Sequence, residues 1–228
     1  MSRALPHLGQ FGDIREHWPI RRRSLFRLGI LTPLPRESWA DDLAALLAKL
    51  ATAIGARQPA KGMTTRIVAI DGLGGAGKST FAEHLSITLD GAEIIHTDDF
   101  ASWENPLDWW PQLIENVLGP VSRNEMVRFQ RSQWQADSDP EWVEFRPDNF
   151  LILEGVTAAR EAFAPYLTYA IWVEAPEELR LRRGLERDGQ TARKQWELWM
   201  ADEARYRSRE RPDERADLVI RGDRDLWT

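Results

Sequence analysis

The feature that most constrains the fold is a glycine-rich segment between an apolar run and a helical pattern. The apolar run covers 67–70 and ends at Asp71, and residues 72–80 then read Gly-Leu-Gly-Gly-Ala-Gly-Lys-Ser-Thr. This spacing is the phosphate-binding loop pattern, which follows a strand and opens a helix. Residues 81–89 continue with helical spacing. The order of strand, loop and helix favours a phosphate-binding loop over an ordinary glycine-rich turn without a ligand.

Each residue type in such a loop has a chemical task. Glycines let backbone N–H groups turn inward around a polyphosphate, and the following helix adds the positive end of its dipole. Lys78 can reach the β- and γ-phosphates of ATP, and the Ser79 hydroxyl can ligate Mg²⁺. We therefore expect ATP and Mg²⁺ as cofactors. The expected nucleotide-binding residues are Gly72, Gly74, Gly75, Ala76, Gly77, Lys78, Ser79 and Thr80.

Composition excludes several other kinds of site. The chain has 228 residues, of which 43% are hydrophobic, and it contains no cysteine, so disulfides and thiolate chemistry are excluded. Its four scattered histidines lack the spacing of zinc ligands. The absence of a membrane-length apolar run and of a signal-peptide core predicts a cytoplasmic protein without a membrane partner. The net charge of −6 argues against a general nucleic-acid binder.

Charge and proline content divide the chain into an extension and a body. Residues 1–36 carry seven arginines, two acidic residues and four prolines, with no sustained period. We interpret this basic N-terminal extension as a solvated arm, the alternative being a contact for nucleic acid or an acidic partner. Residues 37–61 are expected to form a helix over 38–53 and a linker. Residues 62–228 form the expected P-loop domain.

After the loop, short apolar segments alternate with helical patterns. Strands are expected at 92–96, 150–153, 167–173 and 218–220, and helices at 107–117, 157–163, 176–187 and 192–209. Such alternation builds a parallel sheet with helices on both faces. The predicted fold class is α/β, a three-layer P-loop NTPase fold with a parallel sheet and an N-terminal helical extension.

Acidic residues follow two of the expected strands, at the sheet edge where ligands of open α/β sheets bind. Asp98 and Asp99 follow the second strand, and one of them can accept the proton of a hydroxyl that attacks the γ-phosphate. The alternative is that the pair caps the next helix. Glu154 ends the strand at 150–153, where a carboxylate can face Mg²⁺ or its water shell.

The segment 176–211 is rich in arginine and is expected to form a lid. Arg180, Arg183 and Arg187 share one helix face by their i, i+3, i+7 spacing. This face could close over ATP and stabilise charge on the transferring phosphoryl group. Ordinary ion pairs with nearby glutamates are the competing explanation.

In these motifs the chain resembles the uridine kinase family, within the wider group that includes phosphoribulokinase and bacterial pantothenate kinase. The phosphate loop is specific to the superfamily, and the ordered set of motifs is moderately specific to the family. The matching motifs lie between about residues 62 and 222: Asp71 to Thr80, Thr97-Asp-Asp-Phe100, Asn105-Pro-Leu-Asp108, Leu153-Glu-Gly155, Arg182-Arg-x-x-x-Arg187-Asp188 and Ala216 to Ile220.

The resemblance implies an ATP- and Mg²⁺-dependent phosphotransferase for a small hydroxyl-bearing metabolite, with a homo-oligomer as a further possibility. It implies that Asp98, more than Asp99, is the general base and that Glu154 assists Ser79 at the metal. Arg183 and Arg187 would act from the lid together with Lys78. The segment 216–222 would line the adenine side, and Asp98 and Phe100 would border the substrate.

The substrate insert at about 101–146 departs from the family pattern. Uridine kinases usually carry Tyr-Asp-Phe or Tyr-Asp-Trp there, whereas the aligned stretch here is Arg131-Ser-Gln-Trp134. We therefore expect an acceptor other than uridine. The insert contains five tryptophans, at 103, 109, 110, 134 and 142, which could stack on a flat substrate or fill a satellite core. Trp103 and Trp134 are the candidate substrate contacts.

Two other classes of function remain as alternatives. A switch or mechanical NTPase is disfavoured because the chain lacks both the Asn-Lys-x-Asp guanine signature and the Ser-Gly-Gly motif of transporter ATPases. A catalytically idle ATP-binding regulatory protein is disfavoured because Lys78, Ser79 and Asp98 are all present.

Overall fold

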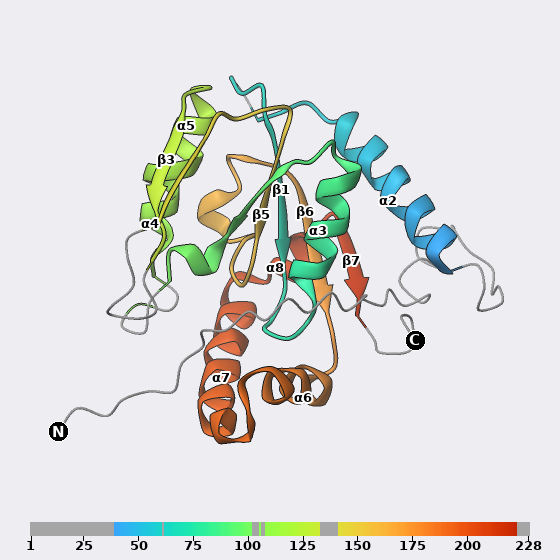
Figure 1. Ribbon diagram of the computed structural model, residues 1–228, viewed down its shortest axis with the longest axis vertical. Helices are drawn as coiled ribbons and strands as arrows, with labels where there is room; N and C mark the ends of the chain where they lie inside the picture. The colour runs from blue at the N-terminus through green and yellow to red at the C-terminus, as the bar shows by residue number, and fades with distance from the viewer. Residues whose placement is uncertain (1–38, 61, 102–104, 106–107, 133–140, 223–228) are drawn as a thin grey trace.

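A five-stranded parallel sheet is the frame of the structure, a computed structural model that describes residues 39–60, 62–101, 105, 108–132 and 141–222. The strand order is β2-β5-β1-β6-β7, and each neighbouring pair is parallel. This arrangement, shown in Figure 1, confirms the expected α/β P-loop fold. The strands are β1 (Arg66–Asp71), β2 (Glu93–His96), β5 (Phe150–Glu154), β6 (Leu167–Glu174) and β7 (Leu218–Arg221).

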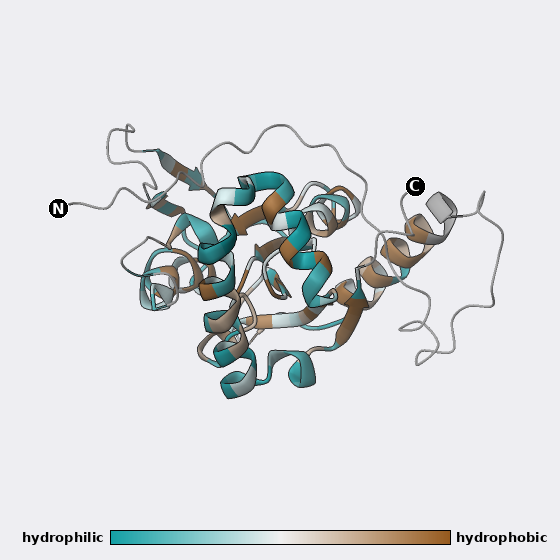
Figure 2. Cartoon of the chain, turned by 90° about the horizontal axis from the view of Figure 1, so that it is seen from below, coloured by the Kyte–Doolittle hydropathy of each residue, from teal (hydrophilic) through white to brown (hydrophobic). Residues whose placement is uncertain are grey.

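Helices cover both faces of the sheet because its central strands are apolar on both sides. On one face, α2 (Trp39–Gly55) and α3 (Lys78–Thr88) pack their apolar side chains against alternate strand residues. On the other face lie α4 (Trp110–Leu113), the π-helical η4 (Ile114–Leu118) and α5 (Gly119–Ser122). Figure 2 shows the hydrophobic residues in brown along the strands between these layers.

A pair of helices lies beyond the carboxyl ends of the strands, at the bottom of Figure 1. These are α6 (Glu177–Asp188) and α7 (Arg193–Glu210), joined by the short turn η6 (Gln190–Ala192). Trp196 of α7 packs with Leu185 of α6 in a small cluster of their own. The helix α8 (Pro212–Arg215) then leads into β7. The pair α6–α7 covers the segment for which the sequence predicts a lid. Closure over a ligand stays a prediction, and we use the word lid for these two helices.

Two elements differ from the sequence expectation. The helix expected at 107–117 begins at Trp110 and continues as a π-helix. The helix expected at 157–163 is wrong: only the single 3₁₀ turn η5 (Glu161–Phe163) forms there. Thr157 has a left-handed φ of 71°, and its N–H bonds to Asp71, so the segment cannot start a helix at that residue.

The insert also contains an antiparallel hairpin that the sequence did not predict. Its strands are β3 (Val127–Gln130) and β4 (Trp142–Phe145). Hairpins are recognised in a sequence by a two-residue turn such as Asn-Gly, and the eleven-residue connection at 131–141 carries no such signal.

The sheet topology fixes where a ligand can bind. From the central strand β1 the chain crosses to β2 on one side, and later to β6 on the other. In an open α/β sheet, the crevice at such a switch of direction lies outside the carboxyl ends of the strands. The phosphate loop at 72–77 follows β1 directly and therefore lies at this crevice.

Candidate active site

The phosphate loop occupies the connection between β1 and α3. Lys78 is the first residue of α3 and is buried, with its Nζ donating to the carbonyl of Leu73 at 3.3 Å. Ser79 donates its hydroxyl to Oε1 of Glu154 at 3.2 Å. The lysine, the hydroxyl and the helix N-terminus thus share one end of the loop, and all the residues expected to bind nucleotide, at 72–80, lie in this loop and the first turn of α3.

Glu154 ends β5, between the ends of β1 and β2, and its side chain is buried. Its second carboxylate oxygen lies 2.7 Å from Nδ1 of His96, at the end of β2. Burial by itself favours the neutral acid, but the hydrogen bond to His96 and the charge of Lys78 lower the pKa of Glu154 overall. The same hydrogen bond raises the pKa of His96 against the effect of burial. Glu154 is therefore held as a carboxylate.

Asp98 lies in the turn η3 (Thr97–Asp99) that follows β2. The residue keeps an exposed surface, yet the surrounding protein removes part of its hydration and raises the pKa of its carboxyl. The charge of Glu154 adds to this rise, while Lys78, His96 and Arg187 oppose it. Asp98 is therefore within electrostatic range of the loop lysine and of a lid arginine.

Gly155 allows β2 and β5 to bring these acids together. It has a φ of 139°, and a Cβ at this position would lie 1.9 Å from the Thr97 hydroxyl. The turn carrying Asp98 therefore sits directly against the residue after Glu154. Only glycine fits this close approach.

Asp99 has a different environment from Asp98. Its Oδ1 lies 3.2 Å from Nε of Arg131, and its carbonyl accepts the N–H of Ser132 at 2.6 Å. Arg131 also pairs with Glu141. Arg131 and Ser132, the first two residues of the stretch that departs from the uridine kinase pattern, therefore border the turn that carries Asp98.

The aromatic candidates of the insert divide into two groups. Phe100 is buried and stacks with Trp109 and Phe129, at centroid distances of 6.0 and 4.8 Å. Trp109 is buried against Phe163 and belongs to the core cluster that also contains residues of the sheet strands, such as Ile67 and Leu151, so it fills the main core on this face of the sheet. Trp103 and Trp134 lie outside the described residues, and their role stays a prediction.

The lid arginines contact the loop and their own helix. Arg180 donates to the carbonyl of Gly74 at 3.3 Å, and Arg183 donates to the carbonyl of Gly75 at 3.1 Å. Arg187 pairs with Asp188 at 2.8 Å. Arg180 and Arg183 therefore contact the phosphate loop, while Arg180 and Arg187 form ion pairs. The contact of these arginines with ATP stays a prediction.

Asp71 is a site residue that sequence reasoning missed. Its buried carboxylate accepts the N–H groups of Gly72, Thr157 and Ala159 at 2.6, 3.1 and 2.8 Å, and the hydroxyl of Tyr206 at 2.6 Å. Burial raises the pKa of Asp71, and these hydrogen bonds oppose the rise. One carboxylate therefore joins the start of the loop, the segment after β5 and the helix α7. Its position directly before the first loop glycine was the available signal.

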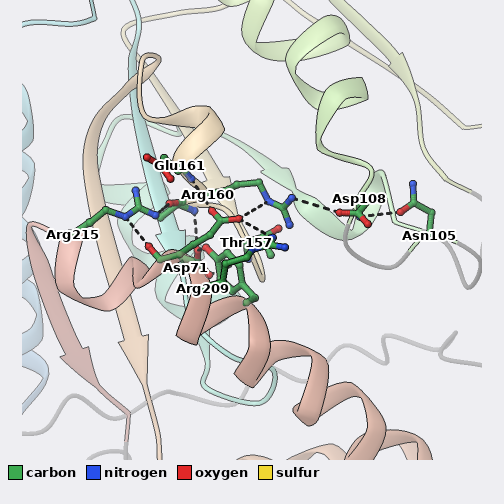
Figure 3. Close-up of polar contacts among 11 residues, drawn as sticks. Asp71, Asn105, Asp108, Thr157, Arg160, Glu161, Arg209 and Arg215 are labelled. Atoms are coloured by element: carbon green, nitrogen blue, oxygen red, sulfur yellow. Dashed lines mark hydrogen bonds and ion pairs between the residues drawn. The ribbon is translucent and has the colours of Figure 1, made fainter.

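Figure 3 shows how this network extends from Asp71. The buried Arg160 lies 3.9 Å from Glu210 of α7 and 3.9 Å from Asp108 of the insert. Arg215 of α8 donates to the carbonyl of Ala159 at 3.0 Å. The segment after β5 therefore ties the lid to the body of the protein.

Oxygen ligands for a metal are few in this site. Within the described ranges, no group of three or more His, Asp or Glu side chains could hold a metal ion.

No helix of the described part of the chain is long and apolar enough to cross a membrane.

No family model matches the chain, and no curated protein matches its sequence. Among solved structures, a possible uridine kinase from Bacillus stearothermophilus is similar with a TM-score of 0.59 and 20% identity, over 78% of this chain and 98% of that one. A candidate fructose transport system kinase from Silicibacter sp. TM1040 has a TM-score of 0.52 and 19% identity, over 76% and 96%. At these identities the similarity establishes a shared fold.

Proposed function

We propose that the chain is an ATP- and Mg²⁺-dependent phosphotransferase that phosphorylates a hydroxyl group of a small metabolite. The observation that carries the proposal is the meeting of Lys78, Ser79, Asp98 and Glu154 at the carboxyl ends of β1, β2 and β5. A phosphate-binding cation, two oxygen ligands and a carboxylate base are the parts that phosphoryl transfer needs. Both structural neighbours are described as kinases, which agrees with this class.

The donor set fits magnesium. The Ser79 hydroxyl and the Glu154 carboxylate supply two hard oxygens 3.2 Å apart. Mg²⁺ prefers few protein ligands, with waters and phosphate oxygens completing its shell. When bound, it would neutralise charge on the phosphates.

Asp98 is proposed as the general base. Its raised pKa makes it a better proton acceptor than an ordinary aspartate, and its neighbours Lys78 and Arg187 are cations suited to the transferring phosphoryl group. Arg183 and Arg187 belong to the lid. The acceptor would bind beside Arg131 and Ser132, with Phe100, Trp103 and Trp134 as candidate neighbours.

An acceptor screen tests the proposal. ADP release is followed with Mg²⁺ and ATP over nucleosides, pantothenate-like alcohols and sugar alcohols, with Lys78→Ala as the inactive control. We expect release that depends on one class of acceptor and that is lost in the variant, with uridine and cytidine as poor acceptors. Release without any acceptor would instead indicate a switch or mechanical NTPase. ATP binding with no product across the panel would indicate a regulatory protein.

A further inference from the structure

Side chains of α6 and α7 form hydrogen bonds with the backbone of Gly74 and Gly75, the two middle glycines of the phosphate loop. Glu203 of α7 accepts the N–H of Gly74 at 2.6 Å. Arg180 of α6 donates to the carbonyl of Gly74 and to the other oxygen of Glu203, both at 3.3 Å. We call this arrangement of Arg180 and Glu203 around Gly74 the clamp. Arg183 holds the next carbonyl, that of Gly75.

The clamp is sealed from solvent. Glu203 is 0% exposed and Arg180 is 5% exposed. A buried ion pair of this kind contributes little net stability, and in some proteins its role is to specify one arrangement. A role in the placement of the loop is therefore a more specific explanation than general stabilisation.

The loop glycines fit the lid closely. A Cβ at Gly74 would lie 2.8 Å from Oε1 of Glu203 and 3.2 Å from the Trp196 ring. At Gly75, which has a φ of 73°, a Cβ would lie 2.6 Å from the carbonyl oxygen of Arg180. Glycine at positions 74 and 75 therefore allows α6 and α7 to pack closely against the loop. This packing requirement exists whether or not a phosphate is bound.

Peptide geometry links the clamp to phosphate binding. In a trans peptide the C=O of one residue and the N–H of the next point in opposite directions. The Arg180 guanidinium holds the C=O of Gly74, so the N–H of Gly75 points away from that guanidinium. Backbone N–H groups of such loops are the donors that surround a bound phosphate.

We propose that Arg180 and Glu203 are positioning residues of the loop. Glu203 holds the N–H of the peptide between Leu73 and Gly74 and orients Arg180. Arg180 in turn fixes the peptide between Gly74 and Gly75, so that the Gly75 N–H faces a bound polyphosphate. Arg180 then acts through the loop, whereas the sequence suggested direct contact with ATP. The inference rests on the proposed function only in taking a polyphosphate as the ligand of the loop.

The test is the double variant Arg180→Met/Glu203→Gln. Methionine keeps much of the arginine stem, and glutamine keeps an oxygen for the Gly74 N–H, while removal of both charges leaves no buried ion unpaired. The matched control is Arg182→Met/Glu186→Gln, an exposed pair on α6 whose Nε and Oε1 lie 4.0 Å apart. Thermal unfolding confirms that both proteins are folded. Calorimetry then measures the Kd for inorganic tripolyphosphate, Mg·ATP and adenosine.

We expect the clamp variant to bind tripolyphosphate and Mg·ATP about ten-fold more weakly, with adenosine binding unchanged. The control should match the wild type. Unchanged polyphosphate affinity in the folded clamp variant would overturn the inference. Tighter affinity would also overturn it, because Glu203 would then compete with phosphate for the Gly74 N–H. A wild type that binds polyphosphate but phosphorylates nothing counts against the proposed function alone. A wild type that binds no polyphosphate overturns both.

Discussion

At the scale of single residues, the two adjacent aspartates differ in what surrounds them. Asp98 interacts with Glu154, Lys78 and Arg187, which are the groups expected around the metal and the phosphates. Asp99 pairs with Arg131 of the insert, 3.2 Å away. The sequence left two roles open, proton acceptance and local structure. We propose the first for Asp98 and the second for Asp99.

Replacing each aspartate by asparagine separates these roles. Asp98→Asn cannot accept a proton, so we expect kcat to fall by about 10²-fold or more while the Kd for ATP changes only a few-fold. Asp99→Asn is the matched control and should retain most of kcat. Steady-state kinetics together with calorimetric binding measure both values. The reverse ranking of the two variants would show that Asp99 is the base.

The buried Glu203 predicts a pH dependence of stability. Burial raises the pKa of its carboxyl above the usual 4.5, although Lys78 and the Gly74 N–H oppose the rise. This carboxyl binds its proton more tightly in the folded protein than in the unfolded chain. The free energy of unfolding therefore falls as the pH rises from the unfolded-state pKa through the folded-state pKa. The side chain of the Glu203→Gln variant cannot titrate. The free energy of unfolding of the variant should therefore increase relative to that of the wild type as the pH rises above about 4.5. Urea denaturation over a pH series measures this difference, and a constant difference would contradict the assignment.

At the scale of elements, α2 belongs to the body of the protein. Leu47, Leu50 and Ile54 pack in the same cluster as strands of the sheet. Arg57, just after the helix, pairs with Asp217 at 2.8 Å and donates to the carbonyl of Thr168 at 3.1 Å. The helix therefore covers a face that would otherwise be exposed.

Truncation and point substitution should separate the extension from this helix. Removal of residues 1–36 should leave a folded, ATP-binding protein, whereas removal through residue 54 should cause aggregation or unfolding. Leu50→Ala should cost about 2–5 kcal/mol of unfolding free energy, and the exposed Lys49→Ala should cost little. Circular dichroism in denaturant measures these values. Unfolding of the shorter truncation would mean that the extension is part of the core.

The sequence predicted those helices, strands and site residues whose patterns lie within a short stretch of the chain. Apolar strands with following acids placed Lys78, Ser79, Asp98 and Glu154 at one sheet edge, because the carboxyl ends of parallel strands share that edge. The hairpin of the insert was missed because its strands pair across a long connection.

Glu203 of the clamp and Tyr206 of the Asp71 network were missed for a related reason. Glu203 and Tyr206 contact the loop from α7, about 130 positions later in the chain. Their pattern in the sequence is that of an ordinary charged helix. Only the folding of α7 onto the loop gives these side chains their partners.

At the scale of the whole molecule, the site is assembled from four distant segments. The phosphate loop follows β1, Asp98 follows β2, Glu154 ends β5, and the lid helices α6 and α7 return to the loop between β6 and β7. The Asp71 network joins the loop to the segment after β5 and to α7, and the clamp joins the loop to α6 and α7. A phosphotransferase needs this kind of assembly, since its catalysis depends mainly on positioning and charge.

Direct detection of phosphoryl transfer is the most direct measurement of this function. The protein is incubated with Mg²⁺, ATP labelled with ¹⁸O in its γ-phosphate and the acceptor panel, and the products are identified by mass spectrometry. We predict that one hydroxyl compound other than uridine or cytidine gains the labelled phosphoryl group. Asp98→Asn should yield about 10²-fold less of this product. Labelled inorganic phosphate without any labelled acceptor, or equal product from Asp98→Asn, would contradict the account.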